Sequence, residues 1–274
     1  MTLTSSFRRI TAGVLATLAA AAMSLGAVAP ASAVTGGWAA GQDDRSAAVA
    51  KINGAGMCSG TLIDPQWVLT AAHCLKYLPS GTVGFGEDGQ NEQRQWINSW
   101  THPSQHVDVG LILLNEPVTS IEPMSLYDGD ELEVDQPGTT FGWGGQARQE
   151  SQLRGTNITV HTVGESHFVN LLTHPTLTEV QTAPDSHSVQ GDSGGPLFMD
   201  HDPTAVAAVL SYINSSKPEI PLYSPVSLAQ PWLDEVLAAG HVPSQERMIS
   251  DYLGSLGAGL GDFLGGESVK YIGS

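Results

Sequence analysis

A histidine and a cysteine stand side by side in the segment Leu69-Thr70-Ala71-Ala72-His73-Cys74. An imidazole changes charge near neutral pH, so histidine often acts as a general base, although a single histidine after a strand is more often structural. The chain has only two cysteines, and the other, Cys58, precedes a strand that turns back at Asp64-Pro65. A Cys58–Cys74 bridge would close this hairpin beside His73 and stabilise it by about 3 kcal/mol.

An acidic residue interrupts the apolar run His106-Val107-Asp108-Val109-Gly110-Leu111-Ile112-Leu113-Leu114. The run predicts a buried strand with Asp108 inside it. An unpaired carboxylate is costly to bury, so Asp108 should have a hydrogen-bonding partner. That partner is either the cation of a structural ion pair or a histidine from elsewhere in the chain.

A serine is flanked by glycines in the segment Gln190-Gly191-Asp192-Ser193-Gly194-Gly195-Pro196-Leu197. Glycines let backbone N–H groups approach a ligand closely. The pattern G-x-S-x-G also occurs on the strand-to-helix elbow of α/β-hydrolases, which run in the order serine, acid, histidine. This chain runs His73, Asp108, Ser193, and the glycines and proline after the serine make a poor helix start, so we set the hydrolase elbow aside.

The elements that must position these residues are predicted to be short strands. Of 274 residues, 31 are glycine and 16 are proline, which favours many turns. Apolar runs between turn residues predict an all-β barrel or sandwich; examples are residues 61–63, 67–70, 107–114, 157–163 and 205–212. One helix is predicted over 230–239, with Pro231 in its first turn and Gly240 after its end.

The composition excludes several classes of protein. The formal net charge is −17, which argues against a nucleic-acid partner and against binding to an anionic membrane. Two cysteines are too few for a disulfide-dense miniprotein or a cysteine-rich metal domain.

The first 33 residues read as a secretory signal peptide. Arg8 and Arg9 precede an uncharged stretch rich in Ala and Leu that ends at Ala31-Ser32-Ala33, a pattern typical of cleavage after Ala33. A membrane anchor is the alternative, and the export route, general or twin-arginine, stays open. An exported chain would reach an oxidising environment, in which a disulfide can persist.

The last segment, 241–274, is predicted to be a Gly-rich tail. Residues 252–266 contain six glycines, which disfavour a helix. Leu253, Leu256, Leu260 and Phe263 nevertheless have the spacing of one helical face. A flexible or loosely docked tail and a short helix that binds a partner or a surface both remain open, and the segment is too short to span a bilayer.

Together, the segments around His73, Asp108 and Ser193 resemble the chymotrypsin/trypsin family of serine peptidases, in its secreted, bacterial type. The resemblance covers roughly residues 34–237. Val34-Thr35-Gly36-Gly37 is similar to the family's mature N-terminus and Phe141-Gly142-Trp143-Gly144 to its Gly-Trp-Gly segment. Ser211-Tyr212-Ile213 stands in the place of its substrate-pairing strand.

The resemblance implies an all-β fold of two packed antiparallel six-stranded β-barrels with a C-terminal helix. The peptidase domain would span 34–240, with the first barrel over about 34–124 and the second over about 125–240. The active site would lie in the cleft between the barrels.

The resemblance also implies the role of each site residue. Ser193 would be the nucleophile, His73 the general base, and Asp108 the group that orients the imidazole. The backbone N–H groups of Gly191 and Ser193 would form the oxyanion hole. The new amino terminus at Val34 would pair with the carboxylate of Asp192.

No cofactor and no metal are expected. A calcium loop is not supported, because Glu87 and Asp88 are more simply explained as a solvated turn.

Several positions depart from the family's pattern. Val189 replaces a disulfide cysteine, Tyr212 replaces the usual tryptophan, and Ile213 replaces a glycine that keeps the primary pocket open. His187 falls at the pocket floor, where a trypsin has aspartate. The predicted substrate-binding residues are His187, Ser211, Tyr212 and Ile213. His187 and Ile213 predict a shallow pocket for small or medium apolar side chains, or for acidic ones when His187 is protonated.

The sequence therefore predicts a secreted, monomeric serine endopeptidase that acts on polypeptides. It predicts no nucleic-acid partner and no stable membrane span after signal removal, and it leaves cell-surface association open. The alternative is a non-catalytic member that serves as a binding or adhesion module, with the tail as its interaction element. An esterase or amidase is a further alternative.

Overall fold

The structure is a computed structural model that describes residues 34–239, apart from 42, 55, 78–79, 87, 130, 146–151 and 165–176. The expected signal peptide (1–33) and tail (241–274) lie outside the described residues. Within the described part of the chain, no helix is long and apolar enough to cross a membrane.

Six antiparallel strands close the first barrel in the order β2-β3-β4-β7-β6-β5. Their bounds are β2 (Val49–Asn53), β3 (Met57–Asp64), β4 (Trp67–Thr70), β5 (Thr82–Phe85), β6 (Glu92–Thr101) and β7 (Gly110–Leu114). The short helix α2 (Ala72–Tyr77) follows β4 directly. Every residue of β4 is buried, as expected for an apolar strand of a closed barrel.

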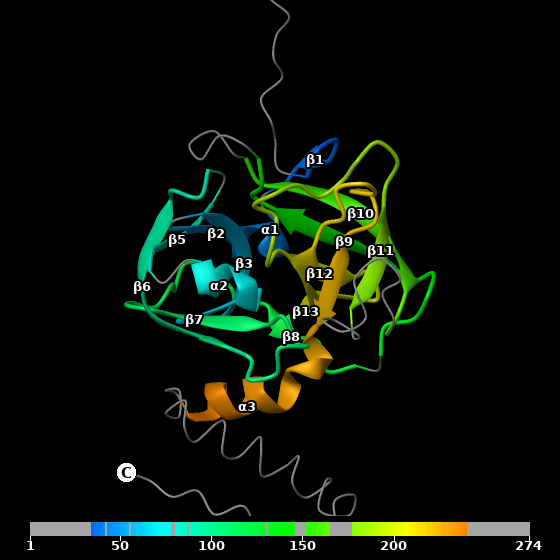
Figure 1. Cartoon of the computed structure of the whole chain (residues 1–274). Coiled ribbons are helices and arrows are strands. Elements are labelled where there is room, and N and C mark those ends of the chain that lie inside the picture. Colours follow the sequence, from blue (N-terminus) through cyan, green and yellow to red (C-terminus); the bar gives the residue numbers. More distant parts are fainter. Residues whose placement is uncertain are drawn as a thin grey trace, which may run out of the picture. The chain divides into compact units, whose positions relative to one another are not determined.

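The second barrel also closes through six antiparallel strands, because β9 pairs with both β10 and β12. Its strands are β9 (Pro137–Gly142), β10 (Arg154–Thr162), β11 (Thr178–Thr182), β12 (Pro196–Met199), β13 (Asp202–Tyr212) and β14 (Leu222–Pro225). The two-residue strand β8 (Ser125–Leu126) joins β13 in parallel. Figure 1 shows the two barrels side by side, which confirms the predicted all-β architecture.

The N-terminal segment of the described chain belongs to the second barrel. Strand β1 (Trp38–Ala39) pairs with β10, placing Trp38 opposite Gly155. The helix α1 (Asp44–Ala48), capped by the side chain of Asp43, then leads into β2. The strands of the first barrel therefore begin at Val49, whereas the expected boundary put its start at residue 34.

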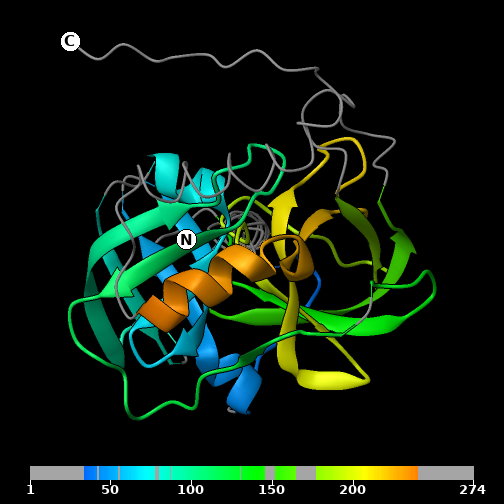
Figure 2. The ribbon, with the colours of Figure 1, turned by 90° about the horizontal axis from the view of Figure 1, so that it is seen from below.

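The C-terminal helix α3 (Gln230–Ala239) has the bounds that Pro231 and Gly240 predict. It follows the 3₁₀ turn η1 (Val226–Leu228) and lies along one end of the barrels (Figures 1 and 2). Trp232 on α3 packs edge-on against His102, which comes just after β6, with ring centroids 5.4 Å apart. The helix thus carries the end of the second barrel's chain back onto the first barrel.

The structure corrects one predicted strand. The run from Val107 was expected to be extended throughout, with Asp108 inside it, but β7 begins only at Gly110. The N–H of Asp108 donates to Ser224 Oγ (3.2 Å), and its carboxylate accepts bonds from other side chains and from the backbone. These bonds replace those of a strand ladder, so Asp108 lies in irregular backbone directly before the strand.

Candidate active site

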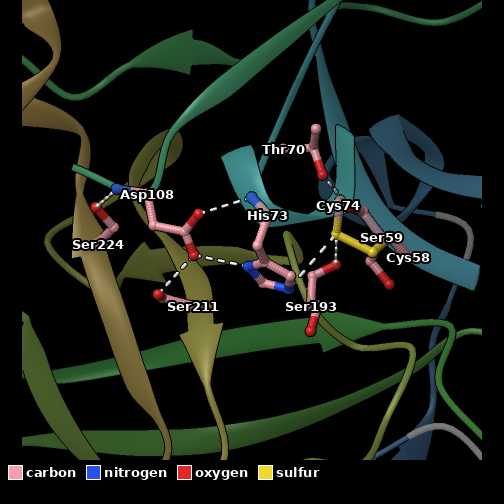
Figure 3. A network of polar contacts seen from close by, with 9 residues as sticks. All are labelled: Cys58, Ser59, Thr70, His73, Cys74, Asp108, Ser193, Ser211 and Ser224. Atoms are coloured by element: carbon pink, nitrogen blue, oxygen red, sulfur yellow. Dashed lines mark hydrogen bonds and ion pairs between the residues drawn. A yellow bond between two sulfur atoms is a disulfide. The ribbon is translucent and has the colours of Figure 1, made fainter. Parts of the chain in front are cut away.

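His73 is the second residue of α2, which only Ala71 separates from β4, and its imidazole is held by a carboxylate. The Nδ1 atom of His73 lies 2.7 Å from Asp108 Oδ2. The backbone N–H of His73 donates to the other carboxylate oxygen, Oδ1, at 2.8 Å. Since both oxygens bind the same residue, the carboxylate fixes the position of the backbone and the orientation of the ring together (Figure 3).

Asp108 is buried, and its neighbours keep it ionised. Burial pushes the pKa of this carboxyl upward, but hydrogen bonds and charge from His73 and a hydrogen bond from Ser211 outweigh burial, so the net pKa is lowered. The Ser211 hydroxyl donates to Oδ2 at 2.6 Å. The carboxylate is therefore a fixed negative charge behind the imidazole.

Ser193 stands in the turn before β12 and faces the same cleft as His73 (Figure 3). In the rotamer present, Ser193 Oγ makes no hydrogen bond to His73 Nε2, which instead lies 3.8 Å from Cys74 Sγ. In enzymes without substrate such bonds are often long or absent and form in the complex.

The turn that carries Ser193 contains two backbone donors that have no acceptor among the described residues. Among the described residues, neither the N–H of Gly191 nor that of Ser193 donates a hydrogen bond within the chain. Gly191 has φ +101°, a conformation that side-chain-bearing residues rarely adopt. Two free N–H groups beside a serine hydroxyl form the kind of site that binds a developing oxyanion.

Asp192 points away from the cleft and is fully buried. Its carboxylate accepts N–H bonds from Gly144 (2.7 Å), Val189 (2.8 Å) and Val34 (3.3 Å). Burial nevertheless raises the pKa of Asp192 to about 6, although the three N–H bonds act in the opposite direction. A side chain at Gly144 or Gly142 would collide with this carboxylate, which explains the Gly-Trp-Gly segment.

The two cysteines form a disulfide, Cys58–Cys74, with Cα atoms 6.3 Å apart. It joins β3 to α2 next to His73. The two sulfur atoms and His73 lie close enough together to suggest a metal site, but sulfurs bonded to each other are not available as thiolate ligands. This group of residues does not fit a metal.

A cleft of about 1030 Å³ runs past His73 and Ser193. Of the expected substrate-binding residues, Ser211, Tyr212 and Ile213 line it. His187 is not among the lining residues, and its N–H donates instead to the carbonyl of Thr35 (3.0 Å). Its expected place at the pocket floor therefore stays a prediction.

Two serines of the site were not singled out from the sequence. Ser224 binds the N–H of Asp108, and Ser59 binds the turn that carries Ser193. Neither has a distinctive local pattern, because their partners lie 116 and 132 residues away in the chain. For Ser59, its place directly after Cys58 was the one available signal.

Comparison with known proteins gives a consistent family. The family model described as Trypsin matches residues 35–233. Kallikrein-11 of Homo sapiens is 32% identical over 168 residues, which are 52% of this chain and 57% of that protein. An uncharacterized peptidase of Corynebacterium glutamicum (strain R) is 26% identical over 237 residues, 84% of this chain and 82% of the relative.

The matched kallikrein-11 proteins of human and mouse are covered over 57% and 59% of their length. Two solved structures share the fold. One, named HL collagenase, has a TM-score of 0.65 at 20% identity and covers 75% of this chain and 99% of its own. The other, human heparin binding protein, has a TM-score of 0.62 at 22% identity and covers 77% and 100%.

Proposed function

The chain belongs to the trypsin family, and on that premise we propose that it is a secreted serine endopeptidase that cleaves peptide bonds through an acyl-enzyme intermediate. The observation that carries the proposal is the 2.7 Å contact of His73 Nδ1 with the buried Asp108, in the cleft that Ser193 lines. This arrangement supplies a nucleophile and a base, with a group that orients the base.

The reaction uses side chains of both barrels. Ser193 Oγ attacks the scissile carbonyl and gives its proton to His73 Nε2. That nitrogen is free to accept it, because Asp108 holds the proton of the neutral ring on Nδ1. The imidazolium then protonates the leaving amine, and water hydrolyses the acyl-enzyme by the same steps in reverse.

The Gly191 and Ser193 N–H groups stabilise the oxyanion of each tetrahedral intermediate. Neither has another partner among the described residues, so binding an oxyanion breaks no bond within the described chain. Each such donor accounts for a factor of about 10²–10³ in turnover.

The amino terminus at Val34 completes this site when the chain is cut after Ala33. Val34 is 1% exposed, and its nitrogen already lies 3.3 Å from Asp192 Oδ2. Its φ is +37°, unfavourable for a β-branched residue. Cutting the preceding peptide bond abolishes this torsion and turns an amide donor into an ammonium ion beside the carboxylate. Removal of the signal peptide is then itself the activating step.

Export follows from the predicted signal and fits the disulfide, which persists outside the cytosol. We expect the processed protein to be a monomer, which size-exclusion chromatography with light scattering tests. N-terminal sequencing of the secreted protein should begin at Val34, and a start far from that residue contradicts the proposed processing.

The test of function is cleavage of a peptide library by the processed protein, with Ser193→Ala as control. The proposal expects amide bonds to be cut by the first protein only. Cleavage of esters without peptides would favour the esterase or amidase, and no hydrolysis by folded, processed protein would favour the non-catalytic binding module.

A further inference from the structure

Ser59 lies where the first barrel meets the turn that carries Ser193. It follows Cys58 in β3 and is completely buried. Its backbone N–H donates to the carbonyl of Ser193 at 2.7 Å, and its carbonyl accepts a bond from Thr70 Oγ1 at 2.8 Å. The backbone of Ser59 is thus part of the contact between β3 and the nucleophile turn (Figure 3).

The hydroxyl of Ser59 adds a second bridge, to the two segments of the second barrel that build the oxyanion site. It donates to the carbonyl of Gly191 at 3.0 Å and accepts the backbone N–H of Trp143 at 2.9 Å. One oxygen of the first barrel therefore links the glycine that offers an oxyanion donor to the segment that binds Asp192 through Gly144.

Neither bridged group has another partner in the described chain, so loss of the hydroxyl leaves a buried donor and a buried acceptor unpaired. The contact is also tightly packed. A Cβ placed on Gly195 would lie 3.4 Å from the Ser59 Cβ, and one on Gly194 would lie 2.4 Å from the Ser59 carbonyl. A bulkier residue at position 59 would disturb this packing.

The carbonyl that Ser59 holds belongs to Gly191, the residue whose N–H is the proposed oxyanion donor. Gly191 is a glycine at φ +101°, so its backbone has alternative conformations within reach that would turn the N–H away. Other bonds in the turn restrain its neighbours: Asp192 N–H donates to Val189 and Gly145 N–H to Gln190, each at 3.0 Å. The hydroxyl of Ser59 restrains the carbonyl of Gly191 itself.

We propose that Ser59 is a positioning residue for the oxyanion site, whose hydroxyl fixes the Gly191 peptide against the first barrel and so aims its N–H at the scissile carbonyl. The inference rests on the proposed peptidase function. Ser59 touches no substrate atom and acts through Gly191 and Trp143.

The test compares transition-state and ground-state binding in processed Ser59→Ala. A misaimed oxyanion donor lowers kcat, and we expect a fall of about 10- to 100-fold with KM changed less than about threefold. Affinity for a peptide aldehyde, which forms a tetrahedral adduct with Ser193, should fall by the same factor as kcat/KM. Affinity for the corresponding non-covalent product peptide should stay within about threefold.

A matched control is Ser46→Ala. Ser46 is also buried, and its hydroxyl also makes two hydrogen bonds, to the carbonyls of Gly41 and Asp43. None of these three residues lines the cleft. It should lose stability without a change in kcat or in aldehyde affinity. If Ser59→Ala does not fold, Ser59→Gly takes its place, because it also lacks the hydroxyl but keeps the backbone N–H and carbonyl of residue 59. It is judged by the same comparison of aldehyde affinity with product-peptide affinity.

Unchanged kcat and aldehyde affinity in the Ser59 variant overturn the inference, and so does an equal loss for aldehyde and product peptide. These outcomes are separate from failure of the proposed function. That failure appears as the same peptide cleavage in Ser193→Ala as in the wild-type chain.

Discussion

The two barrels hold their parts of the candidate site by different means. In the first barrel, side chains hold the His73 region: the Asp108 carboxylate binds both the imidazole and the backbone N–H of His73, and a disulfide ties the helix of His73 to β3. In the second barrel, the turn around Ser193 is held by backbone conformation, by the buried carboxylate of Asp192 and by bonds from Ser59 of the first barrel.

We call His73 and Asp108 the permanent half of the site and the turn around Ser193 the conditional half, because only the turn is expected to respond to processing of the chain. We expect the contacts of His73 and Asp108 to be independent of the chain's terminus, since the bonds between them do not involve Val34. We expect the charge on Asp192 to depend on it, because the pKa of Asp192 is about 6 while Val34 offers only an amide, and an ammonium at Val34 would stabilise the carboxylate. Changes to the two halves should therefore have distinguishable effects.

The largest effect should come from removing the nucleophile or the base, one from each barrel. Ser193→Ala and His73→Ala should each lower turnover by about 10⁴–10⁶, and the double variant should be little worse, because the two groups act as one unit. Steady-state peptide hydrolysis measures all three. Additive losses would mean that the two halves work independently and would break the proposed mechanism.

A block on processing should disable only the conditional half. Protein that keeps a few residues before Val34 should lose about 10²–10³ in turnover, comparable to the loss of one oxyanion donor. The His73–Asp108 contact should persist, visible as the same downfield imidazole proton resonance in both forms. Full activity of the extended protein would show that the terminus does not control the turn.

Loss of the disulfide should weaken the permanent half. Replacing Cys58 and Cys74 by alanine should lower the free energy of unfolding by about 3 kcal/mol in the chain-entropy model. Their separation of 16 residues defines the loop that the bridge closes. Denaturant unfolding measures the change, and an unaltered midpoint would contradict this role of the bridge.

The pH dependence of stability should reveal the uncompensated Asp192. In the extended protein its pKa is raised from the usual 3.8 to about 6, so between these values the folded state keeps a proton that the unfolded state has released. Stability should therefore fall as pH rises from about 4 to about 6 and stay lower above, by on the order of 3 kcal/mol.

Urea unfolding at several pH values compares the extended and processed proteins. The processed protein should show a smaller decline, because the Val34 ammonium stabilises the charged carboxylate. Asp200→Asn, which removes an exposed carboxyl, serves as control and should leave the difference between the two proteins unchanged. Identical pH profiles for both proteins would contradict the pairing.

The smallest effect concerns specificity. Ile213 lines the cleft and packs on the core of the second barrel, so Ile213→Gly should open space for larger side chains. Cleavage after Phe relative to Ala should rise by about tenfold, the size expected for a change of pocket volume. Efficient cleavage after Arg by the wild-type protein would refute the predicted apolar preference.

Much of the architecture follows from local sequence signals. Pro231 and Gly240 predict the bounds of α3, and short apolar runs between turns predict an all-β barrel or sandwich, which the resemblance to the peptidase family narrows to two barrels. The pairing of strands that are far apart in the chain could not be predicted from the sequence. Nothing in the segment around Trp38 reveals that it pairs with Gly155. The apolar run around Asp108 predicted a strand there, although hydrogen bonds to side chains replace the ladder.

The candidate site divides in the same way. The order His73, Asp108, Ser193 and the glycines around the serine are readable because each has a distinctive local pattern. Ser59 and Ser224 are not, since a serine in a strand carries no sign of a partner more than 100 residues away. The place of His187 was predicted by counting along the chain, which does not determine where its side chain points, so its role in the pocket stays a prediction.

Covalent labelling of Ser193 tests the central claim most directly. Processed protein treated with a fluorophosphonate should gain one adduct, which peptide mass spectrometry places on Ser193. Labelling should be lost in Ser193→Ala and slowed by orders of magnitude in His73→Ala. A folded, processed protein that takes no label, or takes it on a different serine, would contradict the account.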